Sequence, residues 1–399
     1  MKISILCHNL SCNGLGRAYL LAKILQRHYK VEIVGPLLGD KIWFPLRDIK
    51  DIDYKFIRLT NGRKVYQELK ELLKLIDGDI IYTIKPLFTS FGIGVIKKLI
   101  TGRPLISDID DLETAFWYRY KNQVSKGRMA KDLFYYLRHP YSLNFYWNSL
   151  LCEKMNFLRP NLLVDGITVS NKFLQDKFGG TIVRHARDTE TFNPEKFDPK
   201  LIKKNYGVEG RKIIMFFGTP GSHQGIEVLI EAINLIGIPN KVGYCPNVML
   251  ILVGIDKNNL YDQGVVRLAN TKLNNRVKIF GQQVFQKIPE LLSLSDIIVV
   301  PQKNEPPSIG QVPAKIFDAM AMAKPIIATK ISDLPEILDD CGYIIEPDNP
   351  QKLADAIQYV LKHPKEAELK GQKVREKCIA KYSYDAMEKV LTNIFKKYE

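Results

Sequence analysis

The sequence Pro313-Ala-Lys-Ile-Phe-Asp-Ala-Met-Ala-Met-Ala-Lys-Pro-Ile-Ile-Ala-Thr329 contains a helical pattern followed directly by a strand pattern. Pro313 suits the first turn of a helix, and the residues after it predict a helix over 314–323. Pro325 ends the helical pattern, and the apolar run to Thr329 predicts a strand that is buried on both faces. Helices that alternate with such strands are typical of parallel α/β sheets.

The same alternation extends in both directions from this stretch. In the second half it predicts further strands at 212–217, 248–254, 277–281 and 297–301, and helices at 225–236 and 353–361. In the first half it predicts strands at 2–7, 31–35, 54–59, 79–84, 104–108 and 166–170, and helices at 14–28, 63–76 and 91–100. Asn193-Pro194 and Asp198-Pro199 interrupt regular structure near 182–200. The sequence therefore predicts an α/β protein with two tandem Rossmann-like domains.

The composition excludes several classes of protein. The chain has 399 residues, of which 46% are hydrophobic and 25% charged, enough for two buried cores and unlike collagen or a disordered tail. No apolar run reaches the roughly 18 residues that cross a bilayer. The six cysteines are scattered without a CxxC pair, so we expect reduced thiols in a cytoplasmic protein.

The positive charge is concentrated in the first half of the chain. Residues 1–183 carry 28 Lys and Arg against 17 Asp and Glu, a net charge of +11, whereas 184–399 carry 30 against 26, a net charge of +4. This asymmetry indicates an anionic partner for the first half, although a generally basic, solvated surface gives the same counts. Nucleic acid is not expected, because the basic residues follow no known reading module.

The segment 116–159 departs from the α/β alternation. It contains twelve aromatic residues, eight Lys or Arg and only two acids. Aromatic residues interleaved with basic ones suit a membrane interface, where the rings lie at headgroup level and the cations meet anionic lipid. The same composition suits a pocket for a lipid-phosphate or sugar acceptor, and it also suits aromatic side chains that simply pack the domain.

Two glycine-bearing turns each lie between a predicted strand and a predicted helix. Gly14 and Gly16 form one turn, and Gly218 and Gly221 form the other. Glycines allow backbone N–H groups to approach a phosphate at a helix N-terminus, and they also simply tighten such turns. The first turn lacks the third glycine and the acidic residue of the dinucleotide fingerprint, so it does not indicate a dinucleotide.

Acidic residues gather directly after the predicted strand 104–108. Asp108, Asp110, Asp111 and Glu113 would repel one another at the carboxyl edge of the sheet, where open parallel sheets bind ligands. The pattern fits a Mg²⁺ site of the haloacid-dehalogenase type, the metal-binding Asp-x-Asp of GT-A transferases, the wall of a two-domain active site, or a solvated loop.

Lys315 and Asp318 are three residues apart near the start of the helix 314–323. They therefore lie on the same side of the helix, where a cation for phosphate and a carboxylate for ribose hydroxyls would face one ligand. A surface pair of opposite charges has the same spacing.

Together these stretches resemble the retaining glycosyltransferases of family 4, which have the GT-B fold. Residues 313–329 are similar to the family's P-x-K-x-x-E-x-x-A-x-G-K-P-V-I-A signature, and 184–194 resemble its N-G-V-D-x-x-x-F-x-P segment. Residues 332–338 and 341–347 are similar to its G-x-P-E-I/V and G-x-L-V-x-P segments. The resemblance implies an acceptor domain at 1–183, a nucleotide-sugar domain at 184–383, a cleft between them, and a helix at about 384–397 that packs back on the first domain.

The resemblance also implies roles for individual residues. Asp318 takes the place of the glutamate that binds ribose, and Gly310 stands where a second glutamate usually contacts the sugar, a contact that then falls to Glu305. Thr219 and Gln224 replace the Arg and Lys that neutralise the diphosphate, so that work passes to Lys315, with Arg187 or Arg184 in reserve. The catalytic positions are expected at Asp110, Asp111 and Lys315. The donor site is expected to comprise Gly14, Gly16, Gly218, Thr219, Gly221, Gln224, Arg187, Gly310, Lys315 and Asp318, and the acceptor side Asp108, Arg17 and Trp117.

The expected function is transfer of a hexose from a UDP- or GDP-linked sugar to a glycan or a polyprenyl-phosphate-linked acceptor in cell-surface polysaccharide biosynthesis. The scheme needs no metal and no cofactor. The expected place is the cytoplasm, with peripheral contact to the inner face of the plasma membrane through 116–159. The departures at Gly310, Thr219 and Gln224 leave a second hypothesis, a non-catalytic protein that binds nucleotide sugars or acts as a membrane-associated scaffold. A Mg²⁺-dependent phosphatase centred on Asp108 and Asp110 is the third.

Overall fold

A computed structural model describes residues 1–60, 64–115, 124–138, 145–158, 163–236 and 247–399. The chain forms two compact units. The first comprises Met1–His185 together with Met387–Glu399, and the second comprises Ala186–Ala386. The sequence predicted a division after residue 183, and the structure divides the chain after His185.

The first unit is built on a seven-stranded parallel sheet in the order β3-β2-β1-β4-β5-β6-β7. Its strands are β1 Lys2–Cys7, β2 Lys30–Leu37, β3 Asp53–Arg58, β4 Ile80–Ile84, β5 Leu105–Ile109, β6 Gly166–Val169 and β7 Thr181–Ile182. Its α-helices are α1 Leu15–Leu25, α2 Val65–Leu75, α3 Ile93–Thr101, α5 Lys126–Arg138, α6 Phe145–Leu158 and α8 Lys172–Phe178, with a 3-10 turn at Phe44–Leu46 and a π-helical turn at Phe88–Gly92.

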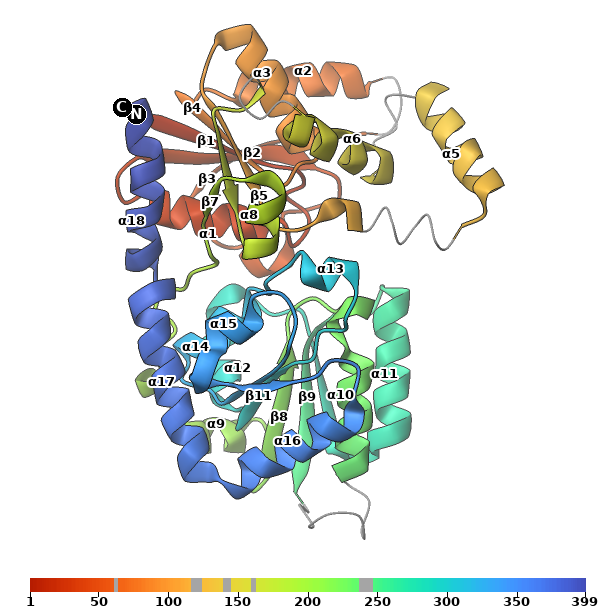
Figure 1. Ribbon diagram of the computed structural model, residues 1–399, viewed down its shortest axis with the longest axis vertical. Coiled ribbons are helices and arrows are strands. Elements are labelled where there is room, and N and C mark those ends of the chain that lie inside the picture. The colour runs from red at the N-terminus through yellow and green to blue at the C-terminus, as the bar shows by residue number, and fades with distance from the viewer. Residues whose placement is uncertain (61–63, 116–123, 139–144, 159–162, 237–246) are drawn as a thin grey trace. The chain divides into compact units, whose positions relative to one another are not determined.

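The second unit has a six-stranded parallel sheet in the order β10-β9-β8-β11-β12-β13. Its strands are β8 Lys212–Phe217, β9 Val248–Ile255, β10 Val277–Gly281, β11 Ile297–Val300, β12 Ile326–Thr329 and β13 Tyr343–Ile345. Its α-helices are α9 Pro199–Asn205, α10 Ile226–Ile236, α11 Leu260–Leu273, α12 Ile288–Ser293, α13 Pro306–Ile309, α14 Lys315–Ala321, α15 Leu334–Leu338, α16 Pro350–Lys362 and α17 Pro364–Tyr382. Short 3-10 turns lie at Pro194–Lys196, Ser222–Gln224, Asn274–Arg276, Phe285–Lys287 and Asp339–Cys341. In Figure 1, helices flank the strands of each sheet.

The two predicted parallel sheets and the α/β fold class are confirmed. Because strands that are covered on both faces are apolar at every position, the runs in β1, β4, β8 and β11 identified the sheets from sequence. The cleft expected between the two domains stays a prediction.

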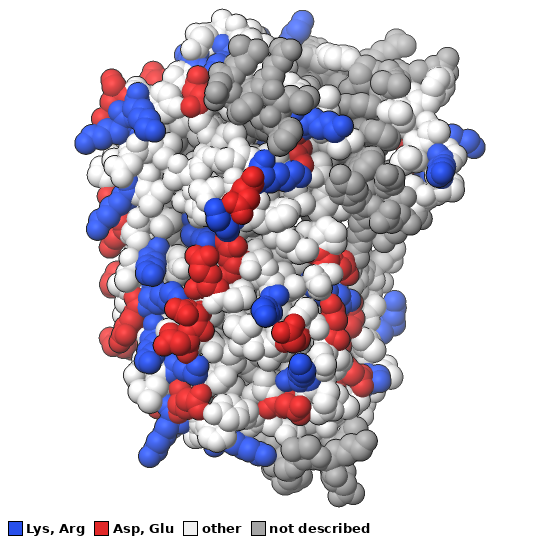
Figure 2. All heavy atoms as spheres, in the orientation of Figure 1, with Lys and Arg blue, Asp and Glu red and all other residues white. Residues whose placement is uncertain are grey.

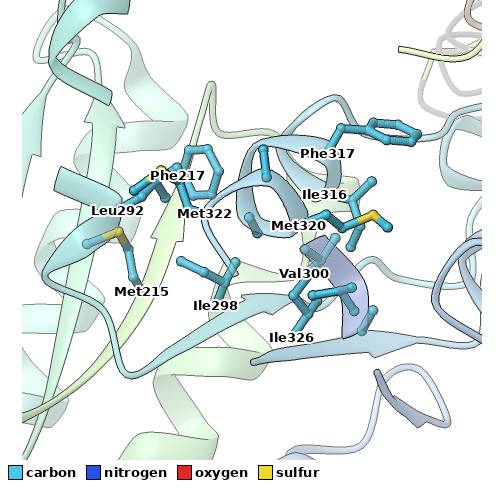
Figure 3. Close-up of a cluster of buried hydrophobic side chains, with 14 of the residues drawn as sticks. Met215, Phe217, Leu292, Ile298, Val300, Ile316, Phe317, Met320, Met322 and Ile326 are labelled. Atoms are coloured by element: carbon cyan, nitrogen blue, oxygen red, sulfur yellow. The ribbon is translucent and has the colours of Figure 1, made fainter. Parts of the chain in front are cut away.

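Residues 313–329, whose pattern predicts a helix followed by a strand, form the middle of the second unit. Every residue of α14 is buried, and Ile316, Phe317 and Met320 pack into a core that also receives Met215 from β8 and Ile326 from β12 (Figure 3). A helix whose residues are all buried must be covered by other elements on every side. α17 provides part of that cover, because a Cβ on its Gly371 would lie 2.3 Å from the Ala323 carbonyl oxygen.

The last helix, α18 Tyr384–Phe395, begins in the second unit and ends in the first, and a 3-10 turn at Lys396–Tyr398 follows it. Its Phe395 is fully buried and meets the Tyr82 ring of β4 edge-on at a centroid distance of 5.3 Å. Arg27 of the first unit forms an ion pair with Glu388. The C-terminal residues are therefore part of the first unit's core.

Among the described helices, none has a stretch long and apolar enough to cross a membrane. Cys7, Cys12, Cys152, Cys341 and Cys378 are free thiols.

Candidate functional site

Lys315 lies at the start of α14 with its amine buried in the second unit. The residue is only 8% exposed. Its Nζ is 3.7 Å from the centre of the Phe216 ring, and it donates a hydrogen bond to Gln224 Oε1 at 3.0 Å. We call Phe216, Gly218, Gln224 and Lys315 the lysine site. The aromatic face attracts the cationic form of the amine, but it replaces only part of the hydration that burial removes.

Gly218, which follows β8, brings the backbone close to this amine. Its φ of +103° lies where residues with a side chain are strained, and an added Cβ would lie 3.3 Å from Lys315 Cε. Gly254 lies behind it with a φ of +107°, and a Cβ there would be 2.5 Å from the Gly218 carbonyl oxygen. The turn after β8 can therefore approach Lys315 only because both positions are glycine.

Burial lowers the pKa of Lys315 to about 7, and the nearby Asp318 opposes this shift. Within the described residues, no carboxylate forms an ion pair with its Nζ. The amine is therefore close to half protonated near neutral pH, and an anion beside it would favour the charged form.

Asp318 is bound by Arg187 rather than by Lys315. Arg187 Nε donates to one carboxylate oxygen, and Nη2 donates to the other at 3.0 Å. The same guanidinium donates to the carbonyl oxygens of Ala186 and Ala314. Both charged residues are more than nine-tenths buried. Most of the guanidinium donors of Arg187 are thus used within the protein, and its role as a reserve cation for a diphosphate stays a prediction. Lys315 and Asp318 are not a surface pair.

Arg187 also lies where two distant segments of the second unit meet. Its backbone N–H donates to the Tyr382 carbonyl oxygen at 2.9 Å, and its carbonyl oxygen accepts from the Tyr384 N–H at 3.0 Å. The bidentate pair with Asp318 therefore ties these segments to the helix that carries Lys315.

The remaining donor-site candidates of the second unit are Gln224, Gly221, Thr219 and Gly310. Gln224 Nε2 donates to Gln311 Oε1 at 3.1 Å and to His223 Nε2 at 3.0 Å. Gly221 is close to the His223 ring, since a Cβ there would lie 3.0 Å from Cε1. Thr219 is exposed, and the buried Gly310 ends α13. The structure thus brings Gln224 and Gly218 to Lys315. Glu305, the expected sugar contact, directly precedes α13 and is half-buried.

In the first unit, Asp108 and Arg17 bind each other. The two form a bidentate pair, with Arg17 Nε and Nη2 at 3.0 and 2.9 Å from the two Asp108 oxygens. Thr168 donates to the same carboxylate at 2.6 Å, and Tyr82 is within 3.4 Å. Asp108 is fully buried and Arg17 is 3% exposed. The pair is thus held in the interior of the sheet, and its expected place on the acceptor side stays a prediction. Arg17 donates to both Asp108 oxygens and Thr168 to one of them, an arrangement that disfavours Mg²⁺ at this residue.

Lys85 lies among the other three acids, and we call Lys85, Asp110, Asp111 and Glu113 the acidic cluster. Its Nζ is 2.6 Å from Glu113 and 3.3 Å from Asp110, and it forms a closer contact with Asp111. Three carboxylate oxygens of the cluster lie within 4.8 Å of one another, a spacing that also suits a metal ion. In this arrangement the lysine ammonium is the cation that offsets their repulsion.

The acidic cluster contains strongly perturbed carboxyl groups. Burial raises the pKa of Asp110 to about 7 although Lys85 opposes the shift, and burial also raises the pKa of Glu113. Burial alone would lower the pKa of Lys85, but the three acids outweigh it and raise that pKa well above its usual value. Asp111 is the member with the more exposed side chain, at 19%. Perturbed carboxyl groups at the carboxyl edge of a parallel sheet are candidates for catalysis.

Sequence reasoning missed Lys85 and His8. His8 follows β1, Lys85 follows β4 and Asp110 follows β5, and these three strands are neighbours in the sheet. The carboxyl-edge rule that identified the acids would therefore also have found both residues. Burial lowers the pKa of His8 to about 3, so its ring is neutral. The ring packs against Gly14, where a Cβ would lie 2.2 Å from Cε1, which explains the glycine at that position.

Trp117 and Gly16 are two further residues that the sequence predicts for the site. Trp117 lies outside the described residues, as do parts of the segment 116–159. Gly16 is covered by Trp43, whose ring would lie 3.4 Å from a Cβ at this glycine.

Figure 2 shows Lys and Arg beside Asp and Glu over the described parts of one face of the molecule, so the charge on that face is mixed rather than a continuous basic track.

Comparison with known proteins relates the second unit to a family of transferases. Residues 211–363 match the family model described as "Glycosyl transferases group 1". The chain is 24% identical over 198 residues to alpha-D-kanosaminyltransferase of Streptomyces kanamyceticus, a match that covers 49% of this chain and 48% of that protein. The chain thus spans about half the length of this curated relative.

Solved structures resemble the chain over its whole length. Anabaena HepE in complex with UDP and glucose has a TM-score of 0.75 at 17% identity, with complete coverage of both chains. WaaG, a glycosyltransferase involved in lipopolysaccharide biosynthesis, has a TM-score of 0.67 at 14% identity and covers 98% of this chain and 99% of its own. Residues 211–363 thus carry the sequence pattern of the group 1 glycosyl transferases, in a chain that has the GT-B fold of solved glycosyltransferases.

Proposed function

We propose that the protein is a retaining glycosyltransferase that moves a hexose from a nucleotide-diphosphate sugar to a glycan or a lipid-linked acceptor. The observation that carries the proposal is the buried amine of Lys315, which lies without a carboxylate partner among the described residues beside the glycine turn after β8. This arrangement lies inside the stretch that matches the group 1 glycosyl transferases. A diphosphate supplies the missing negative charge.

The chemistry of transfer requires charge stabilisation at the leaving group. When the sugar leaves, negative charge develops on the oxygen of the β-phosphate. Lys315 and the backbone N–H groups of Thr219 and Gly221 are the donors proposed to stabilise it, because the Gly218 N–H already donates to the Val253 carbonyl oxygen and Pro220 has no N–H. Asp318 is proposed to bind the ribose hydroxyls through lone pairs that Arg187 leaves open, since each carboxylate oxygen accepts more than one hydrogen bond. The scheme uses no metal.

The acidic cluster supplies a second group of candidates for the same reaction. Asp110 and Asp111 are proposed to accept hydrogen bonds from a donor or acceptor hydroxyl, or to stabilise positive charge on the anomeric carbon. The pKa of Asp110, which burial raises to about 7 although Lys85 opposes the shift, supports a carboxyl group that changes protonation near neutral pH.

The proposed donor is UDP- or GDP-linked, and the proposed setting is cell-surface polysaccharide biosynthesis. The structural likeness to a protein bound to UDP and glucose supports the first, and the likeness to a lipopolysaccharide glycosyltransferase supports the second. We also propose peripheral membrane contact at the inner face of the plasma membrane. Exposed Lys126, Arg128 and Lys131 on α5 support it, since anionic headgroups attract such residues.

The test adds UDP, GDP and other nucleoside diphosphates singly and measures the thermal midpoint of the protein. Binding to the native state raises that midpoint in proportion to affinity and concentration. One diphosphate is expected to stabilise the wild type, and Asp318→Ala is expected to remove the effect. A nucleotide sugar with the same base should then be consumed when lipid extract is added. No stabilisation by any diphosphate and no consumption of donor would overturn the proposal.

The second candidate function is a non-catalytic protein that binds nucleotide sugars. The glycine at position 310 and the absence of a basic side chain at Thr219 and Gln224 favour it. Stabilisation by a diphosphate without turnover for any glycan, lipid or water acceptor would support this candidate over the enzyme.

A further inference from the structure

Gln224 is the one hydrogen-bond acceptor that the described residues offer to the Lys315 amine. Its Oε1 faces Nζ, and its Nε2 donates to Gln311 and to His223. All three contacts require the amide oxygen to point at the lysine and the amide nitrogen to point away. The side chain is 6% exposed, so this orientation is fixed by buried partners.

The charged groups around the amine do not neutralise it. Asp318, one helical turn away on α14, directs both carboxylate oxygens to Arg187. His223, on the turn before α10, contacts the Gln224 amide nitrogen, which points away from the lysine. From β8 the contacts are the Phe216 ring and the backbone of Gly218, neither of which titrates. At the lysine site, therefore, the group beside the Lys315 amine is the Gln224 amide. A carboxylate in the same position would form an ion pair with the amine.

We infer that Gln224 is a positioning residue that keeps Lys315 without a counter-ion, so that a diphosphate bound at the lysine site takes up one proton with it. The inference rests on the proposed function, because the diphosphate is that of the donor. A neutral amine costs less to bury than an ammonium, and the arriving phosphate supplies the charge that makes the ammonium favourable. The burial-driven shift in the pKa of Lys315 agrees with the geometry.

If Gln224 has this role, a glutamate cannot replace it although the two side chains have the same shape. In Gln224→Glu a carboxylate would face Nζ and form an internal ion pair, so Lys315 would stay protonated in the free protein. The phosphate would then bind to a neutralised pair, and its affinity is expected to fall by about tenfold or more. The matched control is Gln372→Glu, which makes the same change of charge at an exposed position of α17.

The first experiment follows the amine without nucleotide. Lysines are reductively methylated with ¹³C-formaldehyde, and the signal that disappears in Lys315→Arg is followed against pH. The wild type and Gln372→Glu are expected to titrate near neutral pH, and Gln224→Glu is expected to titrate at a distinctly higher pH. Titration of the wild-type amine at the pH of an ordinary lysine would overturn the inference.

The second experiment measures UDP and GDP binding by calorimetry at pH 8 in two buffers of different ionisation enthalpy. The phosphate, whose second pKa is near 6, is fully ionised at this pH and contributes no proton change. We expect uptake approaching one proton in the wild type and none in Lys315→Arg or Gln224→Glu. Wild-type affinity should fall about tenfold per pH unit above the midpoint of the amine.

The outcomes distinguish the inference from the function on which it rests. Binding of UDP or GDP without proton uptake overturns the inference and leaves the proposed function standing. Binding of neither nucleotide to the wild type, with the amine titrating as expected, overturns the proposed function and the coupled proton uptake together.

Discussion

Both oxygens of the Asp318 carboxylate are bound by the Arg187 guanidinium, although 131 residues separate the two in the sequence. This pair is the reason that Lys315, one turn earlier on the same helix, has no carboxylate of its own among the described residues. Arg187, which lies outside α14, thus determines the charge of the lysine site.

Replacement of Lys315 by methionine is expected to stabilise the protein and to remove nucleotide binding. The folded chain holds this amine with a pKa of about 7, whereas the unfolded chain has the ordinary value of 10.5. The unfolded state therefore binds more protons between these two pH values, so wild-type stability rises across that window. The advantage of Lys315→Met should be about 1–3 kcal/mol at pH 7 or below and should shrink toward pH 10. Urea unfolding at pH 6, 8 and 10 measures it.

Lys324→Met is the control for this prediction. Lys324 is a half-buried lysine of the same unit, and its Nζ donates to the carbonyl oxygens of Ser293 and Ser295. Its replacement removes two hydrogen bonds but should leave nucleotide affinity unchanged. Equal loss of affinity in both variants would contradict the role given to Lys315.

Arg187→Met should destabilise the protein strongly, because it leaves the buried Asp318 carboxylate without its partner. Breaking a buried ion pair on one side costs about 3–5 kcal/mol. The double variant Arg187→Met/Asp318→Leu removes both charges and should recover most of that loss. A double-mutant cycle from urea unfolding measures the coupling. Additive effects of the two single changes would show that the pair contributes no interaction energy.

Lys85→Met is expected to destabilise the first unit in a pH-dependent manner. Without the ammonium, the carboxyl groups of the acidic cluster face one another uncompensated, so the folded pKa values of the buried Asp110 and Glu113 rise further above those of the unfolded chain. The folded state then binds more protons than the unfolded state, and stability falls as pH rises through that range. The loss relative to wild type should therefore be larger at pH 8 than at pH 5 in urea unfolding. Lys85→Arg, which keeps the cation, should show a smaller pH dependence, and an equal deficit at both pH values would contradict the assignment.

The α5 helix is expected to hold the protein on anionic membranes. Replacing Lys126, Arg128 and Lys131 with glutamate should abolish flotation with phosphatidylglycerol-rich vesicles at low salt, since each basic residue near such a surface contributes about 1 kcal/mol. The control replaces Lys362, Lys365 and Lys373, which are exposed in the second unit, with glutamate. Equal flotation of both triple variants and the wild type would remove α5 from the proposal.

The order of strands and helices could be predicted because it depends on local patterns. The strands β1, β8 and β10 have the predicted bounds, since each is an apolar run that ends at a polar residue or a glycine. The short β7 and β13 were missed because two or three residues carry no periodic signal. The highly charged α17 was also missed, although its buried positions Ala367, Gly371, Val374, Cys378 and Tyr382 follow helical spacing.

The candidate site likewise combines residues that are close in the sequence with residues that are far apart in it. Lys315 and Asp318 were predicted because they occur together in one short stretch. Their actual partners, Gln224 and Arg187, are 91 and 131 residues away, and only the packed fold brings them together. Asp108 was predicted to face an acceptor because no residue near it in the sequence indicates that Arg17 binds its carboxylate.

The contact between Gly218 and Gly254 restricts how this protein can be engineered. Any side chain at Gly254 would strike the backbone of the turn, and any at Gly218 would press on the lysine stem. Thr219 is exposed next to them and carries no such restriction. Mutant libraries of the turn after β8 should therefore randomise Thr219 and keep both glycines fixed.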